Sequence, residues 1–300
     1  MPVLADAVLE HLAIPPGGIV VDATVGLGGH AARILDKLGK QGKLVGLDVD
    51  ETNLALAKDR LACWSDQVEL RRCNFRELRG VLDSMGMAGV HAIVADLGVS
   101  SNQLADADRG LSFIEDGPLD MRLDDRQPTT AADLVNSLSE RELADLFFHN
   151  SQERFSRRIA RRICEVRRTS RIRHTAELAA IVCKALKVDP KARRSKIHPA
   201  TRVFQALRMA VNDEVGALQA LLEAAPACLA GPSTDCEGGR IAVISFHSVE
   251  DGAVKRDFRR RAAAGQYRIC TKKPIVADDD ECRLNPRARS AKLRVAQRVA

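Results

Sequence analysis

Short apolar runs recur along the chain, and the stretches between the first four of them have helical periodicity. The helical spacing is clearest over Thr52–Trp64, where Leu54, Ala57 and Leu61 fall on one face. The runs that predict strands are Gly18–Ala23, Lys43–Asp48, Val68–Arg72, His91–Leu97 and Arg240–Phe246. Because short apolar strands that alternate with helices form parallel sheets, we expect an α/β domain with helices on both faces of a parallel sheet.

More than 130 residues separate the fourth predicted strand from the fifth, and none of them has a convincing strand pattern. This gap is too long for a single crossover, so we expect an inserted helical domain at residues 111–202. Residues 1–110 and 203–300 then form the sheet domain. The helices predicted in the gap are Ala131–Leu138, Glu140–His149, Arg154–Thr169, Thr175–Leu186 and a longer one from Pro199 to about Ala225.

A glycine cluster follows the first predicted strand, and an acidic residue ends the second. Gly26, Gly28 and Gly29 precede a helical pattern in Gly-x-Gly-Gly order, and Asp48 comes twenty residues after Gly28. Glycines let the backbone approach a ligand closely, and a carboxylate at the next strand end can accept the hydroxyl groups of a ribose. The spacing predicts a nucleoside-cofactor pocket. A glycine-rich helix entry beside a solvated Asp48 is the alternative.

Two details favour S-adenosylmethionine over a dinucleotide as the cofactor. The third glycine of the Gly-x-Gly-x-x-Gly pattern, typical of pyrophosphate-binding turns, is missing. Asp22 lies just before the turn, where its charge suits a cationic methionine group and would repel a pyrophosphate. A nicotinamide-dependent oxidoreductase on the same kind of sheet is the alternative that these details disfavour.

Composition places the chain among globular proteins of a reducing compartment. Its 300 residues are 45% hydrophobic, which suffices for one large domain and an inserted one. No apolar stretch is long enough to cross a bilayer, and the N-terminus has no signal segment. The absence of a Cys-x-x-Cys pair argues against a zinc ribbon and favours reduced thiols in the cytoplasm. The eight cysteines are Cys63, Cys73, Cys164, Cys183, Cys228, Cys236, Cys270 and Cys282.

Positive charge is concentrated in one part of the chain. Residues 152–202 hold 16 lysines and arginines against four acidic residues, a net charge of +12. The whole chain carries +6, so the remainder sums to −6. Such segregation, with four arginines between residues 157 and 162, predicts a surface for a phosphate backbone, whereas the alternative is a solubilising helix face. Because aromatic residues make up only 3% of the chain, we expect recognition through arginines and shape rather than base stacking.

Three later segments are rich in residue types that carry chemistry. Asp96 ends the fourth predicted strand, and the carboxyl ends of parallel strands form the ligand crevice, so Asp96–Leu104 is expected to face the cofactor. Arg109–Phe113 and Asp116–Arg122 follow as loops with several arginines and acids. A tight turn explains a Gly-Pro pair within the last segment, but not the charged residues around it.

With these segments the chain resembles the bacterial ribosomal RNA small-subunit methyltransferase H family, which N4-methylates a cytidine of 16S ribosomal RNA. The resemblance runs almost end to end. Its motifs are Asp22–Thr24, Gly26–His30, Asp96–Ser101, Gln103-Leu104, Arg109-Gly110, Ser112-Phe113, Gly117–Arg122, His198–Arg202, Phe204–Arg208, Ser245–Ser248 and Asn285–Arg294. It implies a class I S-adenosylmethionine-dependent methyltransferase: a Rossmann-like doubly wound sheet with an inserted all-helical RNA-recognition domain. The implied substrate is the decoding-centre cytidine of 16S ribosomal RNA in the small ribosomal subunit.

The resemblance also implies a set of cofactor-binding residues. They are Gly28, Gly29 and His30 at the methionine end, Asp48 at the ribose, Phe75 beside the adenine, and Asp96 and Gln103 completing the pocket. The residues alone support the glycines, Asp48 and Asp96. Without the resemblance, Phe75 is a core residue at a strand end, His30 supplies a backbone N–H at a helix start, and Gln103 is not singled out.

The implied reaction needs few catalytic groups. The exocyclic amine of cytosine is a poor nucleophile, so transfer requires in-line positioning and an acceptor for the proton that leaves nitrogen. We predict that Asp96 lies closest to the reacting centre and that Asp120 is a second candidate, the alternative being a loop-organising hydrogen bond to Arg122. No metal is required, because the sulfonium is already a strong electrophile. The predicted RNA-binding residues are Arg157, Arg161, Arg162 and Arg202.

Two further classes compete with this interpretation. A non-catalytic RNA-binding or assembly factor would be expected to have lost the glycine turn, Asp48 or Asp96, and all are present. A DNA amino-methyltransferase would carry a Ser/Asn/Asp-Pro-Pro-Tyr/Phe motif where this chain has Asp96–Val99. The residues leave undecided whether the chain is a monomer or a homodimer, and whether it acts on naked RNA or on the subunit.

The chain departs from the family pattern at three places. It begins at Met1–Leu4, where relatives carry extra residues, which suggests a truncated or misplaced start. Gly252 replaces a usual arginine, and Ser151–Arg154 replaces a more typical Gly-Glu-Glu-Arg. None of these positions belongs to the implied cofactor set, so the departures bear on RNA contacts rather than on the reaction.

Overall fold

The computed structural model describes residues 1–188, 198–233 and 237–300. Part of the predicted basic segment, residues 189–197, lies outside the described residues, and so does Cys236. Within the described parts of the chain, no helix combines the length and the apolar character needed to cross a membrane.

The chain divides into two compact units. Met1–Gly98 and Val215–Ala300 form one, here called the sheet unit, and Val99–Glu214 forms the other, the helical unit. The boundaries lie at 98/99 and 214/215, whereas the sequence suggested 110/111 and 202/203. The helical unit extends further in both directions because Val99 and the later residues Phe204 and Leu207 are buried in its hydrophobic core.

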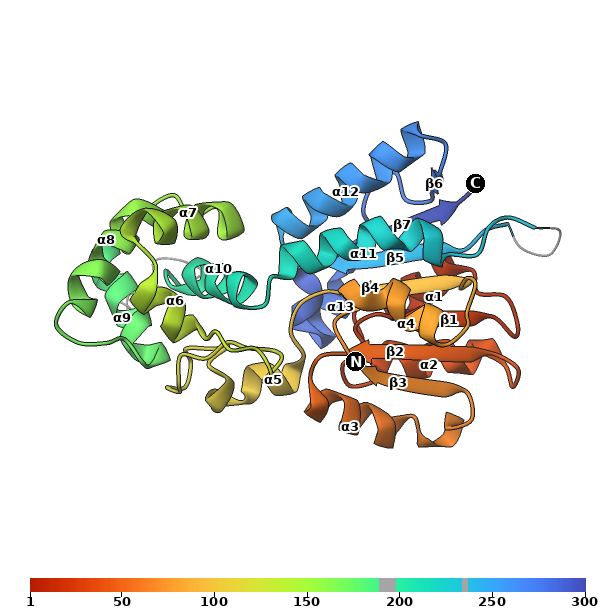
Figure 1. The fold of residues 1–300 in the computed structure, drawn as a ribbon, viewed down its shortest axis with the longest axis horizontal. Coiled ribbons are helices and arrows are strands. Elements are labelled where there is room, and N and C mark those ends of the chain that lie inside the picture. Colours follow the sequence, from red (N-terminus) through yellow and green to blue (C-terminus); the bar gives the residue numbers. More distant parts are fainter. Residues whose placement is uncertain (189–197, 234–236) are drawn as a thin grey trace. The chain divides into compact units, whose positions relative to one another are not determined.

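A seven-stranded sheet lies at the centre of the sheet unit (Figure 1). Its strands are β1 (Ile19–Asp22), β2 (Lys43–Asp48), β3 (Val68–Arg72), β4 (Ala92–Asp96), β5 (Arg240–Ser245), β6 (Tyr267–Ile269) and β7 (Lys292–Arg298). Their spatial order is β3-β2-β1-β4-β5-β7-β6, with β1 to β5 parallel and β7 antiparallel to both neighbours. The five predicted strands are confirmed.

The sheet is mixed rather than wholly parallel, because it also contains β6 and β7, which the apolar pattern did not predict. Lys292, Arg294 and Gln297 interrupt the apolar residues of β7, so it lacks the continuous apolar run of a central parallel strand. Arg294 in its middle is nevertheless buried, because its Nε donates to Asp251 Oδ1 at 2.6 Å. Because this ion pair joins residues distant in sequence, the apolar pattern of the chain could not predict that Arg294 is buried in a strand.

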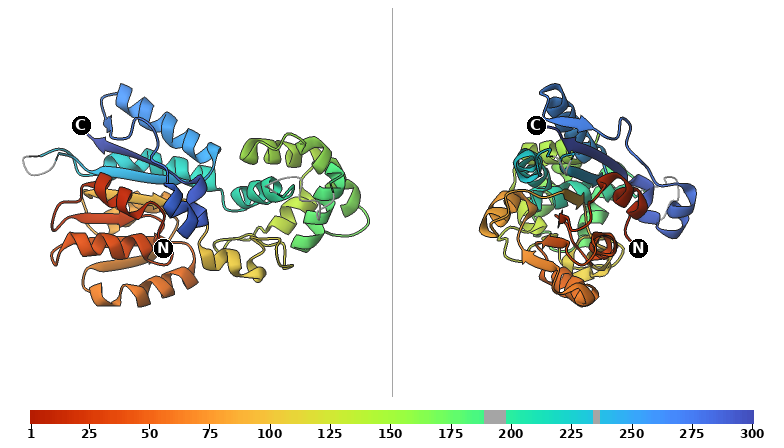
Figure 2. Two further views of the ribbon diagram at one scale, coloured as in Figure 1. Left: turned by 180° about the vertical axis from the view of Figure 1, so that it is seen from behind. Right: turned by 90° about the vertical axis from the view of Figure 1, so that its right-hand side faces the viewer.

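Helices cover both faces of this sheet (Figures 1 and 2). Successive strand residues point to opposite faces, so Val20 and Val94 pack in one core while Val21 and Ile93 pack in the other. The first core is closed by α1 (Ala5–Leu12), α2 (Gly29–Leu38) and α3 (Glu51–Arg60). The second is closed by α4 (Leu78–Ser84), α11 (Glu214–Cys228) and α12 (Ser248–Ala263). The unit also contains α13 (Asp279–Leu284) and the 3-10 helices η1 (Ala62–Trp64), η2 (Phe75–Glu77) and η4 (Pro286–Ser290).

The helical unit packs around its own core, which includes Phe147, Ile159 and Leu178. Its elements are α5 (Ser101–Ala105), η3 (Ala107–Arg109), α6 (Ala131–Ser137), α7 (Glu140–Ser151), α8 (Ser156–Arg167), α9 (Thr175–Leu186) and α10 (Thr201–Val211). The first four helices predicted in the insert are therefore confirmed as α6 to α9. Side-chain caps define two starts, since Thr130 and Ser139 each form a capping box with the acid three residues later.

The longer helix predicted from Pro199 is wrong, because α10 ends at Val211 and α11 begins at Glu214. Asn212 ends α10: its Nδ2 donates to the carbonyl of Met121 at 2.8 Å and its Oδ1 accepts from Leu123 N at 2.8 Å. The next residue has a positive φ of 46°, which no regular helix contains. A side chain that bonds to a distant loop thus breaks an otherwise continuous apolar pattern.

Candidate functional site

The glycine turn after β1 requires glycine for its backbone geometry. Gly26 and Gly28 have φ values of 50° and 74°, in the left-handed region that side chains avoid. A Cβ on Gly28 would also come within 3.4 Å of Ala57 and Leu61, where α3 packs against the turn. Helix α2 begins directly afterwards at Gly29, so its first backbone N–H groups face the carboxyl edge of the sheet.

Asp48 at the end of β2 holds the glycine turn in place. Its Oδ2 accepts from Gly26 N at 2.9 Å and from Asn53 Nδ2 at 3.2 Å, and its Oδ1 accepts from Asp50 N at 2.9 Å. Burial raises the pKa of Asp48 to about 6, although these hydrogen bonds oppose the shift. The structure thus brings the predicted ribose acceptor against the predicted turn, twenty residues away in sequence.

Three titratable side chains gather where β1 and β4 end. Asp22 closes β1, His30 lies in the first turn of α2, and Asp96 closes β4. His30 Nε2 lies 3.6 Å from Asp96 Oδ2, a charge interaction too long for a hydrogen bond. Asp96 N donates to Thr24 Oγ1 at 2.6 Å, which ties the two strand ends together. The sequence predicted Asp22 to lie near the methionine group of the cofactor, but gave no indication that it would lie in one cluster with His30 and Asp96.

This cluster keeps polar atoms without protein partners. Asp22 Oδ2, His30 Nε2 and Asp96 Oδ1 are buried and have no hydrogen-bond partner among the described residues. Burial raises the pKa of Asp22 to about 6, partly offset by the charge of His30. Burial alone would lower the pKa of His30, but its interactions with Asp96 and Asp22 outweigh this effect and raise it. Orphaned acceptors of this kind fit a ligand that brings positive charge and N–H donors.

Residues far from the turn complete its surroundings. A Cβ on Gly29 would lie 3.3 Å from Pro2, so the N-terminal segment packs on the turn. Leu4 N donates to Glu281 Oε1 at 2.6 Å, and the charge of Glu281 contributes to the raised pKa of His30. No local pattern in the sequence connects Pro2 or Glu281 with the glycine turn, so neither residue was predicted to lie near it.

Phe75 and Gln103 are the two predicted cofactor residues that came from the resemblance alone. Phe75 begins η2 just after β3 and is half-buried against the core of the sheet unit, so part of its ring remains accessible. Gln103 belongs to the helical unit, where its Oε1 accepts from Ser100 N at 2.9 Å in the capping box of α5. A structural role accounts for its burial, and its contact with a cofactor stays a prediction.

Asp120 lies in the helical unit and is held by its neighbour Arg122. Arg122 Nε donates to Asp120 Oδ1 at 2.8 Å, and Arg122 Nη2 donates to Oδ2 at 2.8 Å, a bidentate pair. Arg122 N also donates to Oδ1 at 3.0 Å. This arrangement matches the loop-organising alternative, because both carboxylate oxygens already accept hydrogens.

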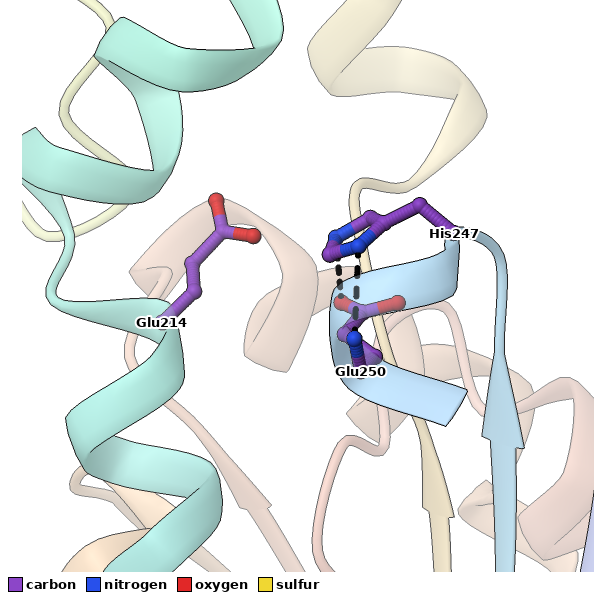
Figure 3. Close-up of side chains that lie close together, drawn as sticks. All are labelled: Glu214, His247 and Glu250. Atoms are coloured by element: carbon purple, nitrogen blue, oxygen red, sulfur yellow. Dashed lines mark hydrogen bonds and ion pairs between the residues drawn. The ribbon is translucent and has the colours of Figure 1, made fainter. Parts of the chain in front are cut away.

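His247 is a polar residue of the sheet edge to which the sequence analysis gave no role, although it lies in one of the quoted motifs. It is the N-cap of α12, two residues after the end of β5, and its Nδ1 accepts from Glu250 N at 3.4 Å. Glu250 is buried, and its Oε2 accepts from Phe246 N at 3.0 Å. Figure 3 shows the imidazole above the Glu250 carboxylate. Its signal in the sequence is a histidine at a strand's carboxyl end.

The predicted RNA-binding arginines differ in whether they already pair with acidic side chains of the protein. Helix α8 buries Ile159 and Ile163 and exposes Arg157 on the opposite side. Arg161 Nε lies 3.5 Å from Glu140 Oε1, and Arg162 Nη1 lies 3.0 Å from Glu165 Oε2. Arg202 is exposed on α10. The described part of the basic segment is therefore an amphipathic helix with a cationic face, partly neutralised by neighbouring acids.

Comparisons with known proteins agree with this architecture. The chain matches the model of the MraW methylase family over residues 1–299. It is 46% identical over 303 residues to the ribosomal RNA small subunit methyltransferase H of Koribacter versatilis, covering 99% of this chain and 93% of that relative. It is 46% identical over 299 residues to the protein of the same name from a Cyanothece species, covering 100% and 94%. A third protein of this name, from Geobacter sulfurreducens, is 45% identical over 313 residues, covering 99% and 98%.

Proposed function

Because the chain belongs to the MraW methylase family, we propose that it methylates the exocyclic N4 of a cytidine in 16S ribosomal RNA. Its cofactor is S-adenosylmethionine, and its fold is that of the class I methyltransferases. The observation that carries the proposal is the family match along the whole chain, together with a cluster of orphaned acceptors at the sheet edge. The cytidine is the decoding-centre nucleotide, and the substrate is the RNA within the small ribosomal subunit.

The residues present fit S-adenosylmethionine. Asp22 buries a carboxylate oxygen that has no hydrogen-bond partner among the described residues, and the ammonium group of the cofactor would satisfy it. Burial raises the pKa of Asp22 even though the charge of His30 opposes the shift, so a further cation beside Asp22 would be favourable. The turn at Gly28 and Gly29 would hold the methionine end, with His30 beside it. Asp48 would hold the ribose and Phe75 the adenine.

When bound, the cofactor supplies an electrophilic methyl group. The protein must then orient the amine and take up the proton that the amine loses. Asp96 Oδ1 is free of hydrogen bonds among the described residues, so it can accept a hydrogen from the amine. Asp120 already accepts from Arg122 through both oxygens, so its role is to organise its loop. Asp96 is therefore the residue that we assign to the reacting nitrogen.

The helical unit would hold the RNA. Its cationic α8 presents Arg157 and Arg161 to solvent, and Arg202 is exposed on α10. Such a face binds phosphates without reading sequence, so the target base must be recognised elsewhere. The target cytidine would be turned out of its stack so that its amine reaches Asp96.

Nucleoside mass spectrometry tests the proposal directly. Small ribosomal subunits from a strain that lacks this protein serve as substrate for the purified chain and S-adenosylmethionine. We expect N4-methylcytidine to be absent from the deletion strain's 16S ribosomal RNA and to appear after incubation. N4-methylcytidine that persists in the deletion strain would contradict the assigned nucleotide, and cofactor that is not consumed would contradict the reaction.

A further inference from the structure

His247 and Asp96 lie at the same edge of the sheet, at the ends of neighbouring strands. Strands β4 and β5 are parallel, with Asp96 in register with Ile244. Beyond the strands, a Cβ on Gly98 would lie 3.6 Å from the ring of Phe246, so the two chain segments leave the sheet in close contact. His247 follows Phe246 directly. Side chains of the two segments can therefore act on one ligand.

The hydrogen bonds of His247 determine its tautomer. Glu250 N donates to His247 Nδ1, and a backbone N–H can only donate, so Nδ1 carries no hydrogen in the neutral ring. The hydrogen is then on Nε2. That atom is buried and makes no hydrogen bond among the described residues; its contact with Glu250 Oε1 at 3.1 Å is a charge interaction, one of the dashed lines in Figure 3. A buried donor without an acceptor is costly, which indicates that an acceptor arrives with a ligand.

We infer that His247 donates this hydrogen to ring nitrogen N3 of the target cytosine while Asp96 Oδ1 accepts from the adjacent amine. The inference deepens the proposed function and rests on it. On its Watson–Crick edge cytosine offers an amine donor beside the N3 acceptor, which is complementary to an acceptor beside a donor on the protein. Uracil and guanine offer the reverse order and would place like groups together. His247 is thus a specificity-determining residue.

The hydrogen bond to N3 should act on binding more than on the chemical step. N3 is not a reacting atom, and the bond to it does not strengthen when the amine lone pair leaves the ring for the methyl group, so it contributes to binding rather than to lowering the barrier. Loss of such uniform binding raises KM and leaves kcat nearly unchanged. An unpaired donor or acceptor in a buried site corresponds to a loss of roughly tenfold to hundredfold in affinity.

Two substitutions separate base recognition from helix capping. In His247→Asn the side-chain oxygen can still accept from Glu250 N, as a good N-cap does, but the distal donor is gone. In His247→Gln the longer side chain brings an amide N–H near the position of Nε2 and gives up the cap. The substrates are small subunits whose 16S ribosomal RNA carries either cytidine or 3-deazacytidine at the target position. The second base has a C–H in place of N3.

The measured quantity is the ratio of kcat/KM for the two substrates. We expect the wild-type protein to prefer cytidine by roughly tenfold to hundredfold, His247→Asn to lose this preference through a raised KM for cytidine, and His247→Gln to retain part of it. Comparing ratios between variants cancels the altered reactivity of the deaza amine. Thermal unfolding of His247→Asn should match the wild type, since the cap is kept.

A preference for cytidine that is as large in His247→Asn as in the wild type would overturn the inference. The wild-type reaction on the cytidine subunit tests the proposed function separately, because it does not depend on which group reads N3. Filter binding of both RNAs to wild type and His247→Asn gives the same ratio without turnover. A failed methylation reaction therefore still leaves the role of His247 decided by binding.

Discussion

A substitution at Asp22 gives the sharpest test of the cluster of Asp22, His30 and Asp96, because the buried charge of Asp22 should destabilise the fold while the proposed cofactor site needs it. Its side chain is 1% exposed, and one of its oxygens has no hydrogen-bond partner among the described residues. Burial raises its pKa from 3.8 to about 6. A carboxyl group that ionises less readily in the folded chain destabilises that state whenever it is ionised.

The sign and size of this effect follow from proton linkage. Below about pH 4 Asp22 is protonated in both states, and the folded chain has no penalty. Between about pH 4 and pH 6 the unfolded chain loses this proton first, so the free energy of unfolding falls as the pH rises. Above about pH 6 the penalty is constant. A shift from 3.8 to about 6 corresponds to roughly 3 kcal/mol.

The substitution Asp22→Asn removes the charge and keeps the oxygen that accepts from Thr24 N at 3.2 Å. We expect the variant to exceed the wild type in stability by up to about 3 kcal/mol at pH 8, to match it near about pH 4, and to bind S-adenosylmethionine more weakly. Urea unfolding between about pH 4 and pH 8 measures the first effect. Calorimetric titration with the cofactor measures the second.

Asp48→Asn is the matched control, because Asp48 has the same raised pKa of about 6 but different partners. Both its oxygens accept hydrogen bonds, from Gly26, Asn53 and Asp50, so an amide NH2 would face a donor on either side. We expect this variant to be less stable than the wild type at pH 8. The reasoning is refuted if Asp22→Asn gains no stability relative to the wild type between pH 4 and pH 8.

Three more predictions concern the reaction, the RNA and the cofactor. Asp96→Asn should lower the single-turnover rate by about a hundredfold or more, whereas Asp120→Asn should lower it by less than about tenfold; equal losses would place Asp120 at the amine. Arg157→Ala should lower the salt dependence of RNA binding by about one phosphate contact, whereas Arg162→Ala should lower it less, because Arg162 already pairs with Glu165. Filter binding at several salt concentrations measures both slopes, and equal slopes for the two variants would contradict the prediction. The affinity of the wild type for S-adenosylmethionine should rise from about pH 5 to pH 7 as Asp22 ionises, and a flat calorimetric profile would contradict this.

Four of the five parallel strands, β1, β2, β4 and β5, were predictable because each is largely buried on both faces and forms an apolar run. Strand β3 at the sheet edge is only partly buried, and its place between two helical patterns predicted it. Strand β7 was not predictable, since Lys292, Arg294 and Gln297 interrupt its apolar residues. The prediction of a single long helix from Pro199 to about Ala225 was wrong because its break, too, depends on a polar side chain. Its break depends on Asn212, whose side chain bonds to a loop about 90 residues earlier in the chain.

Within the site, the sequence alone predicted which positions require glycine and which acidic residues end strands. The turn demands glycine at Gly28 because φ is positive there, and the acids Asp48 and Asp96 end parallel strands, whose carboxyl ends meet at one edge. The sequence by itself therefore determined the five parallel strands, the glycine turn and the sheet edge at which the predicted site residues lie.

Only the tertiary structure decided which polar atoms at that edge keep a partner. Asp48 and Asp22 are both acids at strand ends, yet three donors surround one and leave an oxygen of the other unbonded. In His247, similarly, Nδ1 accepts a hydrogen bond from the first turn of its own helix, whereas Nε2 makes no hydrogen bond among the described residues. Hydrogen-bond satisfaction depends on groups that the fold brings together from distant positions, and no local pattern in the sequence encodes it.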